Sequence, residues 1–111
     1  MNLNEYQTQA RKTAIGMTPE HMVFGLLEEG GEVAGILKRY YRGDEEYENE
    51  VGDLSPFALD RMKAELGDVL WYTAMLADVC GFTLEDVARE NVAKLQRRKA
   101  KDMIHGSGDD R

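Results

Sequence analysis

The sequence predicts an all-α fold, a helical bundle of about four helices per chain that is completed by oligomerisation. Both prolines follow a hydroxyl residue, in Thr18-Pro19 and Ser55-Pro56, which is the order of an N-cap and a first helical position. Apolar residues recur at helical spacing, and no segment shows the alternation of a strand. A chain of 111 residues buries only a modest core, so the apolar stripes of its helices need cover from a partner chain.

These signals place the helices in order along the chain. We expect them at residues 3–14, 19–41, 56–80 and 84–100. Gly81 ends the third helix, and Thr83 provides the N-cap of the fourth. Glu85 and Asp86 follow in its first turn, where carboxylates favour the positive end of the helix dipole.

The segments outside these helices are polar. Residues 42–54 contain two glycines and six acidic residues, and they predict an exposed acidic connection. Residues 106–111 are too polar and glycine-rich to pack unaided. The expected organisation is therefore one domain over residues 1–105, followed by a flexible polar tail over 106–111.

Composition excludes several classes of protein. The chain has 21 acidic and 14 basic residues and a net charge of −7, so a broad basic surface for nucleic acid is missing. No apolar run is long enough to cross a membrane, and the first residues lack the pattern of a signal peptide. Because Cys80 is the only cysteine, no disulfide can form within the chain. We expect a cytoplasmic domain with neither nucleic acid nor membrane as a partner.

Two pairs of carboxylates, Glu29 with Glu32 and Glu65 with Asp68, lie three residues apart within apolar helical stripes. Ionised carboxylates that face a core need compensating charge. Mg²⁺ prefers oxygen ligands and supplies that charge, with Mn²⁺ as an alternative. The other interpretation is salt bridging at a buried interface. Glu28 lies on the flank of the same helix, where it is either a surface residue or an auxiliary ligand.

The fourth helix carries the opposite charge. Asn91, Lys94 and Arg98 share one face of it with apolar residues. A lysine ammonium and an arginine fork suit phosphoryl oxygens, so this face predicts phosphate binding. The alternative is that long basic side chains extend from a half-buried face to water.

The aromatic residues allow two interpretations. Aromatic side chains at helical spacing usually fill the core of a helical bundle. The alternative is that some of them form a platform on which a base stacks. The candidates are Tyr6, Phe24, Trp71, Tyr72 and Phe82.

Three motifs together resemble MazG-like nucleotide pyrophosphohydrolases. The first is Glu-Glu-Gly-Gly-Glu at 28–32, and the second is Glu-Leu-Gly-Asp-Val-Leu-Trp-Tyr at 65–72. The third is Asn-Val-Ala-Lys-Leu at 91–95, followed by Arg98. The resemblance covers most of residues 18–111. The connection between the two acidic motifs is longer than is usual in that family.

The resemblance implies an all-α homodimer or homotetramer that hydrolyses a nucleoside triphosphate to the monophosphate and pyrophosphate. By position, the Mg²⁺ ligands and catalytic residues would be Glu29, Glu32, Glu65 and Asp68. Asn91 and Lys94 would touch the nucleotide or its phosphates, with Arg98 as a further phosphate contact. Two alternatives stay open. One is a phosphoribosyl-ATP or dUTP hydrolase of the same superfamily, and the other is a non-catalytic helical oligomerisation or metal-responsive regulatory protein.

Overall fold

The computed structural model describes residues 1–101, 106 and 108. Over these residues the chain is helical and has no strand, which confirms the all-α class. The elements are α1 (Leu3–Arg11), α2 (Pro19–Tyr41), the short 3₁₀ helix η1 (Glu45–Tyr47), α3 (Pro56–Val79) and α4 (Leu84–Ala100). Within the same residues, none of the helices has the length and apolar character needed to span a membrane.

The three long helices begin at the caps that the sequence predicts. The hydroxyl oxygen of Thr18 accepts a hydrogen bond from the His21 amide at 3.2 Å, at the start of α2. Ser55 caps α3 in the same way, with Pro56 in its first turn. Thr83 caps α4 by accepting the Asp86 amide at 3.1 Å. These caps satisfy amides that have no partner inside the helix.

Helix α1 ends earlier than residue 14, where the prediction placed its end. It begins with a capping box between Asn2 and Glu5, and its last residue is Arg11. The hydroxyl of Thr13 donates to the carbonyl of Ala10 at 2.7 Å and accepts the indole N–H of Trp71 at 2.8 Å. These bonds tie the chain to α3 instead of extending the helix, because a threonine side chain competes with the backbone for hydrogen bonds.

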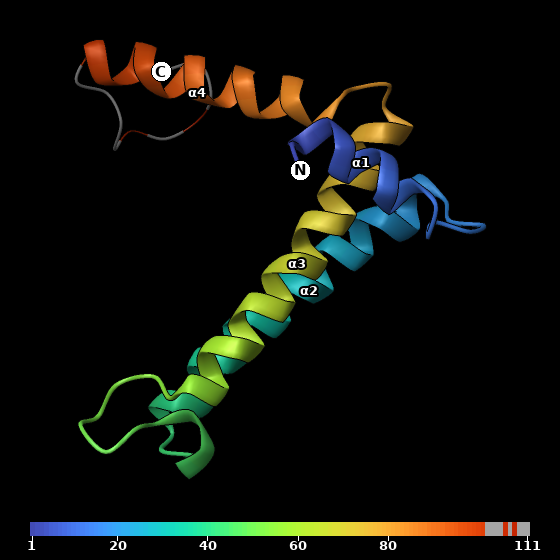
Figure 1. The fold of residues 1–111 in the computed structure, drawn as a ribbon. Helices are drawn as coiled ribbons and strands as arrows, with labels where there is room; N and C mark the ends of the chain where they lie inside the picture. The colour runs from blue at the N-terminus through green and yellow to red at the C-terminus, as the bar shows by residue number, and fades with distance from the viewer. Residues whose placement is uncertain (102–105, 107, 109–111) are drawn as a thin grey trace.

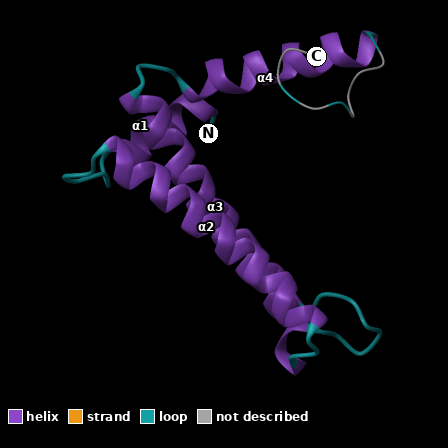
Figure 2. Ribbon diagram, turned by 180° about the vertical axis from the view of Figure 1, so that it is seen from behind, coloured by secondary structure: helices purple, strands orange, loops and turns teal. Residues whose placement is uncertain are grey.

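The helices form a V (Figure 1). Helices α2 and α3 run antiparallel as a long hairpin, and α1 lies across the end where α2 begins and α3 finishes. Helix α4 leaves that end and points away from the hairpin, as Figure 2 shows from behind. Over the described residues α4 contacts α1 and α3 but not α2. The radius of gyration is 17.1 Å, against about 13 Å for a compact chain of this length.

Two apolar clusters hold the hairpin together, one near each end. The cluster at the junction of the four helices contains Ala10, Met22, Ala74, Met75 and Leu84. The cluster at the opposite end contains Ile36, Tyr47 and Ala58. The middle of the hairpin, between these clusters, is where the carboxylates of the two acidic motifs lie.

The connection over residues 42–54 is more ordered than its composition suggests. Five of its six acidic residues are exposed, as predicted, and Asp44 is half-buried. Tyr47 is only 7 % exposed and packs with Ile36 and Ala58. The side chain of Asn49 accepts the amide of Asp53 at 2.8 Å, which closes the loop. Residues 102–105, at the end of the predicted domain, and residues 107 and 109–111 of the predicted tail lie outside the described residues.

Candidate metal centre

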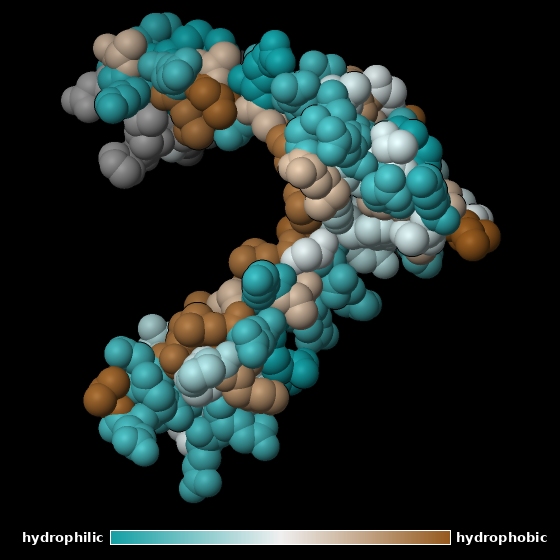
Figure 3. Space-filling view, in the orientation of Figure 1, coloured by the Kyte–Doolittle hydropathy of each residue, from teal (hydrophilic) through white to brown (hydrophobic). Residues whose placement is uncertain are grey.

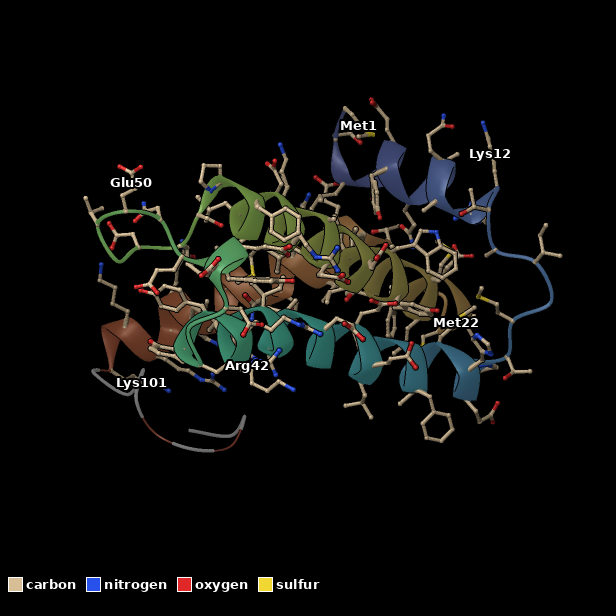
Figure 4. All side chains as sticks on the ribbon, turned by 90° about the horizontal axis from the view of Figure 1, so that it is seen from below. Met1, Lys12, Met22, Arg42, Glu50 and Lys101 are labelled. Carbon is tan, nitrogen blue, oxygen red and sulfur yellow. The ribbon has the colours of Figure 1, made fainter. Side chains whose placement is uncertain are left out.

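Three of the four predicted carboxylates converge between α2 and α3. One oxygen each from Glu29, Glu65 and Asp68 lies within 4.8 Å of the others. Glu29 comes from α2, in the stretch between the labelled Met22 and Arg42 of Figure 4, and the other two come from α3. Glu29 and Glu65 are half-buried and Asp68 is exposed, so the group opens to solvent on one side. Residues far apart in sequence are thus brought to a common point.

The negative charges of this group disfavour one another. The pKa of Glu29 is raised above its usual value, first by burial, then by the charge of Asp68 and a hydrogen bond with Glu65. The guanidinium of Arg61 is 4.0 Å from a carboxylate oxygen of Glu65, one helical turn away. That single long contact compensates little of the charge.

A divalent cation fits this set of donors. Hard oxygen ligands from carboxylates are those that Mg²⁺ prefers, and it commonly keeps several waters in addition to a few protein ligands. The three carboxylates supply oxygens from two rigid helices, and an open side leaves room for water or phosphate. Burial, and after it the charges of the neighbouring carboxylates, raise the pKa of Glu29, and a bound cation would favour its ionised form.

A close helix contact sets the spacing of the three acids. A Cβ built on Gly25 would overlap the ring of Tyr72, so a larger residue does not fit there unless the ring moves. Gly25 precedes Glu29 by one turn on α2, and Tyr72 follows Asp68 by one turn on α3. The glycine therefore allows the two helices to approach next to the carboxylates.

Glu32 lies outside this group. It is exposed and is not among the carboxylates that meet within 4.8 Å. Glu28 is exposed as well. The role predicted for Glu32 as a ligand stays a prediction, and it requires movement of the side chain toward the other three acids.

The predicted phosphate-binding residues lie on another part of the chain. Asn91 is exposed, Lys94 is half-buried and Arg98 is 5 % exposed. A guanidinium nitrogen of Arg98 donates to the carbonyl oxygen of Gly108 at 3.2 Å. Because α4 contacts α1 and α3 but not α2, the described part of one chain does not bring these side chains to the carboxylate of Glu29.

Two further residues lie near the acids, Arg61 and Tyr6, and the sequence predicted Tyr6 only as a core or base-stacking aromatic. Arg61 pairs with Glu65 at a helical i, i+4 spacing, a signal that the sequence does carry. Tyr6 is half-buried on α1, and burial followed by the charge of Asp68 raises its pKa. No spacing rule relates Tyr6 to α3, because they meet only through the tertiary fold.

Comparison with known proteins decides the family. The family model of the MazG nucleotide pyrophosphohydrolase domain matches residues 17–102. The chain belongs to the MazG family. The matched segment contains α2, α3 and α4, with all three converging acids, whereas α1 and its Tyr6 precede it.

Two relatives extend this family comparison. The chain is 35 % identical to the Gene 37 protein of Mycobacterium phage L5, over the full length of both proteins. It is 33 % identical to the uncharacterized protein YvdC of Bacillus subtilis (strain 168), over 66 % of this chain and 68 % of that protein. No solved structure matches the chain significantly.

Proposed function

We propose that this MazG-family chain is a Mg²⁺-dependent nucleoside triphosphate pyrophosphohydrolase. It converts ribo- or deoxyribonucleoside triphosphates to the monophosphate and pyrophosphate. The observation that carries the proposal is the convergence of Glu29, Glu65 and Asp68 within 4.8 Å, inside the segment that matches the family. Converging carboxylates that a cation neutralises suit a substrate rich in phosphate charge.

The residues of the chain divide the chemistry among them. Glu29, Glu65 and Asp68 would hold Mg²⁺, with Glu32 as the fourth ligand. When bound there, the cation would supply positive charge against the phosphoryl oxygens and would lower the pKa of water. Asn91, Lys94 and Arg98 would bind the nucleotide and steady its phosphates through hydrogen bonds and charge.

The reaction requires water, one proton acceptor and pyrophosphate as the leaving group. The water oxygen attacks the α-phosphorus, and the bond from this atom to the bridging α–β oxygen breaks. The proton that water loses passes to a carboxylate.

The decisive experiment is a mass-balanced product analysis on the eight common ribo- and deoxyribonucleoside triphosphates, with and without Mg²⁺. We expect pyrophosphate and monophosphate in equal amounts, only with Mg²⁺, and no orthophosphate. Asp68→Asn should abolish the product, whereas Glu50→Gln, an exposed acid in the connection, should not. Orthophosphate release, or full turnover by Asp68→Asn, would refute the mechanism.

The same experiment separates the alternatives. Turnover confined to dUTP, or to phosphoribosyl-ATP added to the panel, would identify one of the related hydrolases. Calorimetry that detects Mg²⁺ binding without any nucleotide binding would favour the non-catalytic regulatory protein.

We further propose that the working form is a homodimer or homotetramer. Apolar side chains gather along the inner face of the V, over the hairpin and beneath α4 (Figure 3). Exposed large apolar residues include Phe24 and Leu27 on α2, Leu66 and Leu70 on α3, and Val92 and Leu95 on α4. These surfaces and the extended shape of one chain favour a second copy that covers them.

A second copy would also complete the site, since α4 of one chain does not reach its own α2. Mixed oligomers of two inactive variants test this arrangement. Asp68→Asn and Lys94→Ala should each be inactive alone, because each removes one half of the site. In a randomly mixed dimer with shared sites, about a quarter of wild-type activity should return, since half the dimers then contain one intact site. No recovery in verified mixed oligomers would place both halves of the site in one chain.

A further inference from the structure

A pocket of about 450 Å³ lies at the junction of α3 and α4, separate from the three converging acids. Phe82, in the turn before α4, forms one end of it. The other lining residues come from the first turns of α4: Asp86, Val87, Glu90, Asn91 and Lys94. Two of these, Asn91 and Lys94, are the predicted nucleotide contacts. The proposed function gives no role to Phe82, Asp86 or Glu90.

Buried hydrogen bonds fix the turn that carries Phe82. The side chain of Gln7 is 3 % exposed, and its amide nitrogen donates to the carbonyl of Phe82 at 3.0 Å. Its oxygen accepts the amide of Leu84 at 2.8 Å. The amide of Phe82 donates to the carbonyl of Ala77 at 2.8 Å. The backbone is therefore held firmly while the residue as a whole remains 56 % exposed, which suits an aromatic side chain that stacks on a flat ligand.

The polar lining has a definite chemical order. Asp86 and Glu90 are exposed carboxylates on successive turns of one helix face, and carboxylates only accept hydrogen bonds when ionised. Asp86 also lies in the first turn of α4, where the helix dipole favours its negative charge. Lys94 is a cationic donor about 12 Å further along the helix. A ligand that fits has a flat ring, then hydrogen-bond donors, then negative charge.

We propose that this pocket binds the nucleoside part of the substrate, a proposal that rests on the function proposed above. The base lies against Phe82, and Asp86 with Glu90 accepts hydrogen bonds from two adjacent donors on the nucleoside. Two parts of a nucleotide offer such a pair: the N1–H and N2 amino edge of guanine, and the 2′,3′ hydroxyls of ribose. Lys94 then meets the phosphates at the other end of the pocket.

The test measures kcat/KM for GTP, dGTP, ATP, dATP and ITP, the last of which lacks the N2 amino group. Recognition of guanine gives at least about tenfold preference for both guanine nucleotides over the other three, as expected for a polar site left unpaired by the wrong ligand. Recognition of ribose instead gives that preference for GTP, ATP and ITP over both deoxyribonucleotides. Asp86→Asn or Glu90→Gln should reduce the preference at least fivefold, whichever donor pair is involved.

Glu85→Gln is the matched control, because Glu85 lies in the same first turn and shares the helix dipole but lines other surfaces. It should leave every substrate ratio unchanged. Substrate ratios are the readout because a general loss of folding lowers all rates together. If the wild type has no preference, or if Asp86→Asn and Glu90→Gln both keep the wild-type ratios, the assignment of these carboxylates is wrong.

A binding measurement separates this proposal from the proposed function. Calorimetry with GMP, dGMP and AMP should show that Phe82→Ala weakens binding at least about fivefold, the loss expected from one base–aromatic contact. If the wild type releases pyrophosphate and Phe82→Ala binds the monophosphates as tightly as the wild type, the nucleoside pocket is wrong and the proposed enzyme activity stands. If binding depends on Phe82 but no triphosphate is hydrolysed, the nucleoside pocket stands and the proposed enzyme activity is wrong.

Discussion

The junction of the four helices and the middle of the α2–α3 hairpin differ in how completely one chain satisfies them. At the junction, apolar side chains are buried and the polar groups of Gln7 have partners inside the chain. In the middle of the hairpin, three carboxylates crowd together, and apolar residues such as Leu66 and Leu70 are exposed. Within the described residues, one chain therefore satisfies the groups of the junction, whereas in the middle only the distant Arg61 offers counter-charge and the apolar side chains stay exposed.

This difference distinguishes groups that build the fold from groups that meet other molecules. A buried glutamine with its hydrogen bonds satisfied stabilises the chain by itself. A carboxylate whose pKa is raised by burial and by neighbouring charges destabilises the fold when it is ionised without a bound cation. Substitutions at the junction should therefore change stability first, and substitutions in the middle should change ligand binding and turnover first.

The largest expected effect is on turnover, from changes in the middle of the hairpin. Glu65→Gln keeps the size of the side chain but removes one ligand charge. We expect kcat/KM for pyrophosphate release to fall at least about 100-fold, since metal assistance contributes several kcal/mol to the transition state. Thermal unfolding without Mg²⁺ should change little or shift upward, because the substitution relieves repulsion. A large loss of metal-free stability would show that Glu65 is structural.

Glu32→Gln sharpens the same comparison, because Glu32 is exposed and lies outside the three converging acids. If it is the fourth ligand, both Mg²⁺ affinity by calorimetry and kcat/KM should fall. Glu20→Gln, an exposed acid in the first turn of the same helix, serves as the control. Full turnover and unchanged Mg²⁺ affinity in Glu32→Gln would limit the metal centre to three carboxylates.

The next effect is on stability at the junction. Gln7→Leu keeps a buried side chain but leaves the amide of Leu84 and the carbonyl of Phe82 without the partner that Gln7 provides. The free energy of unfolding should fall by about 1–3 kcal/mol for each group left unsatisfied. Urea denaturation measures this loss. Gln9→Leu, on the exposed side of the same helix, should change stability by less than about 0.5 kcal/mol.

Gly25→Ala tests the close contact between Gly25 on α2 and Tyr72 on α3, which lies between the junction and the three acids. Its new methyl group would overlap the Tyr72 ring, so we expect a loss of about 1–3 kcal/mol in the free energy of unfolding. Gly67→Ala is the control, because a Cβ there meets nothing within 4 Å. That change should stabilise α3 by up to about 1 kcal/mol. Equal effects of the two substitutions would show that the close approach at Gly25 is unimportant.

The sequence predicts most of the fold because its signals are local. Thr18-Pro19 and Ser55-Pro56 mark helix starts through caps that involve only neighbouring residues, and the structure has both. The early end of α1 was not predicted, since Thr13 makes its hydrogen bond with Trp71 on a distant helix. The closed loop over residues 42–54 was missed because one buried residue, Tyr47, anchors an otherwise acidic segment.

The site was predictable only in part, because sequence signals are local and the site depends on contacts between distant helices. Helical spacing predicted that Glu29, Glu65 and Asp68 point to a common place, and these three converge. It treated Glu32 as their equal, but the structure places that side chain at the surface. Periodicity gives the face of a helix and not the position of its neighbours. It therefore could not show that Asn91 and Lys94 lie on a helix that points away from the hairpin.

The smallest expected effect is on the pH dependence of stability, which should have opposite signs with and without metal. The folded-state pKa of Glu29 is raised above its usual 4.5, so the folded chain binds more protons than the unfolded chain just above that pH. Without metal, stability should fall as pH rises through this window. Mg²⁺ requires the ionised carboxylate, so the increase in Tm that Mg²⁺ causes should grow with pH over the same window.

Glu29→Gln provides the control, because it removes the titrating group and should flatten both trends in thermal unfolding scans. The Arg11–Asp78 pair does not interfere. Its hydrogen bond and charge lower the pKa of Asp78, so the stability it adds is lost only as pH falls below the usual 3.8 of an aspartate. If Glu29→Gln kept the wild-type trends, the protons would come from another group, and the crowding of charge at Glu29 would not explain the metal centre.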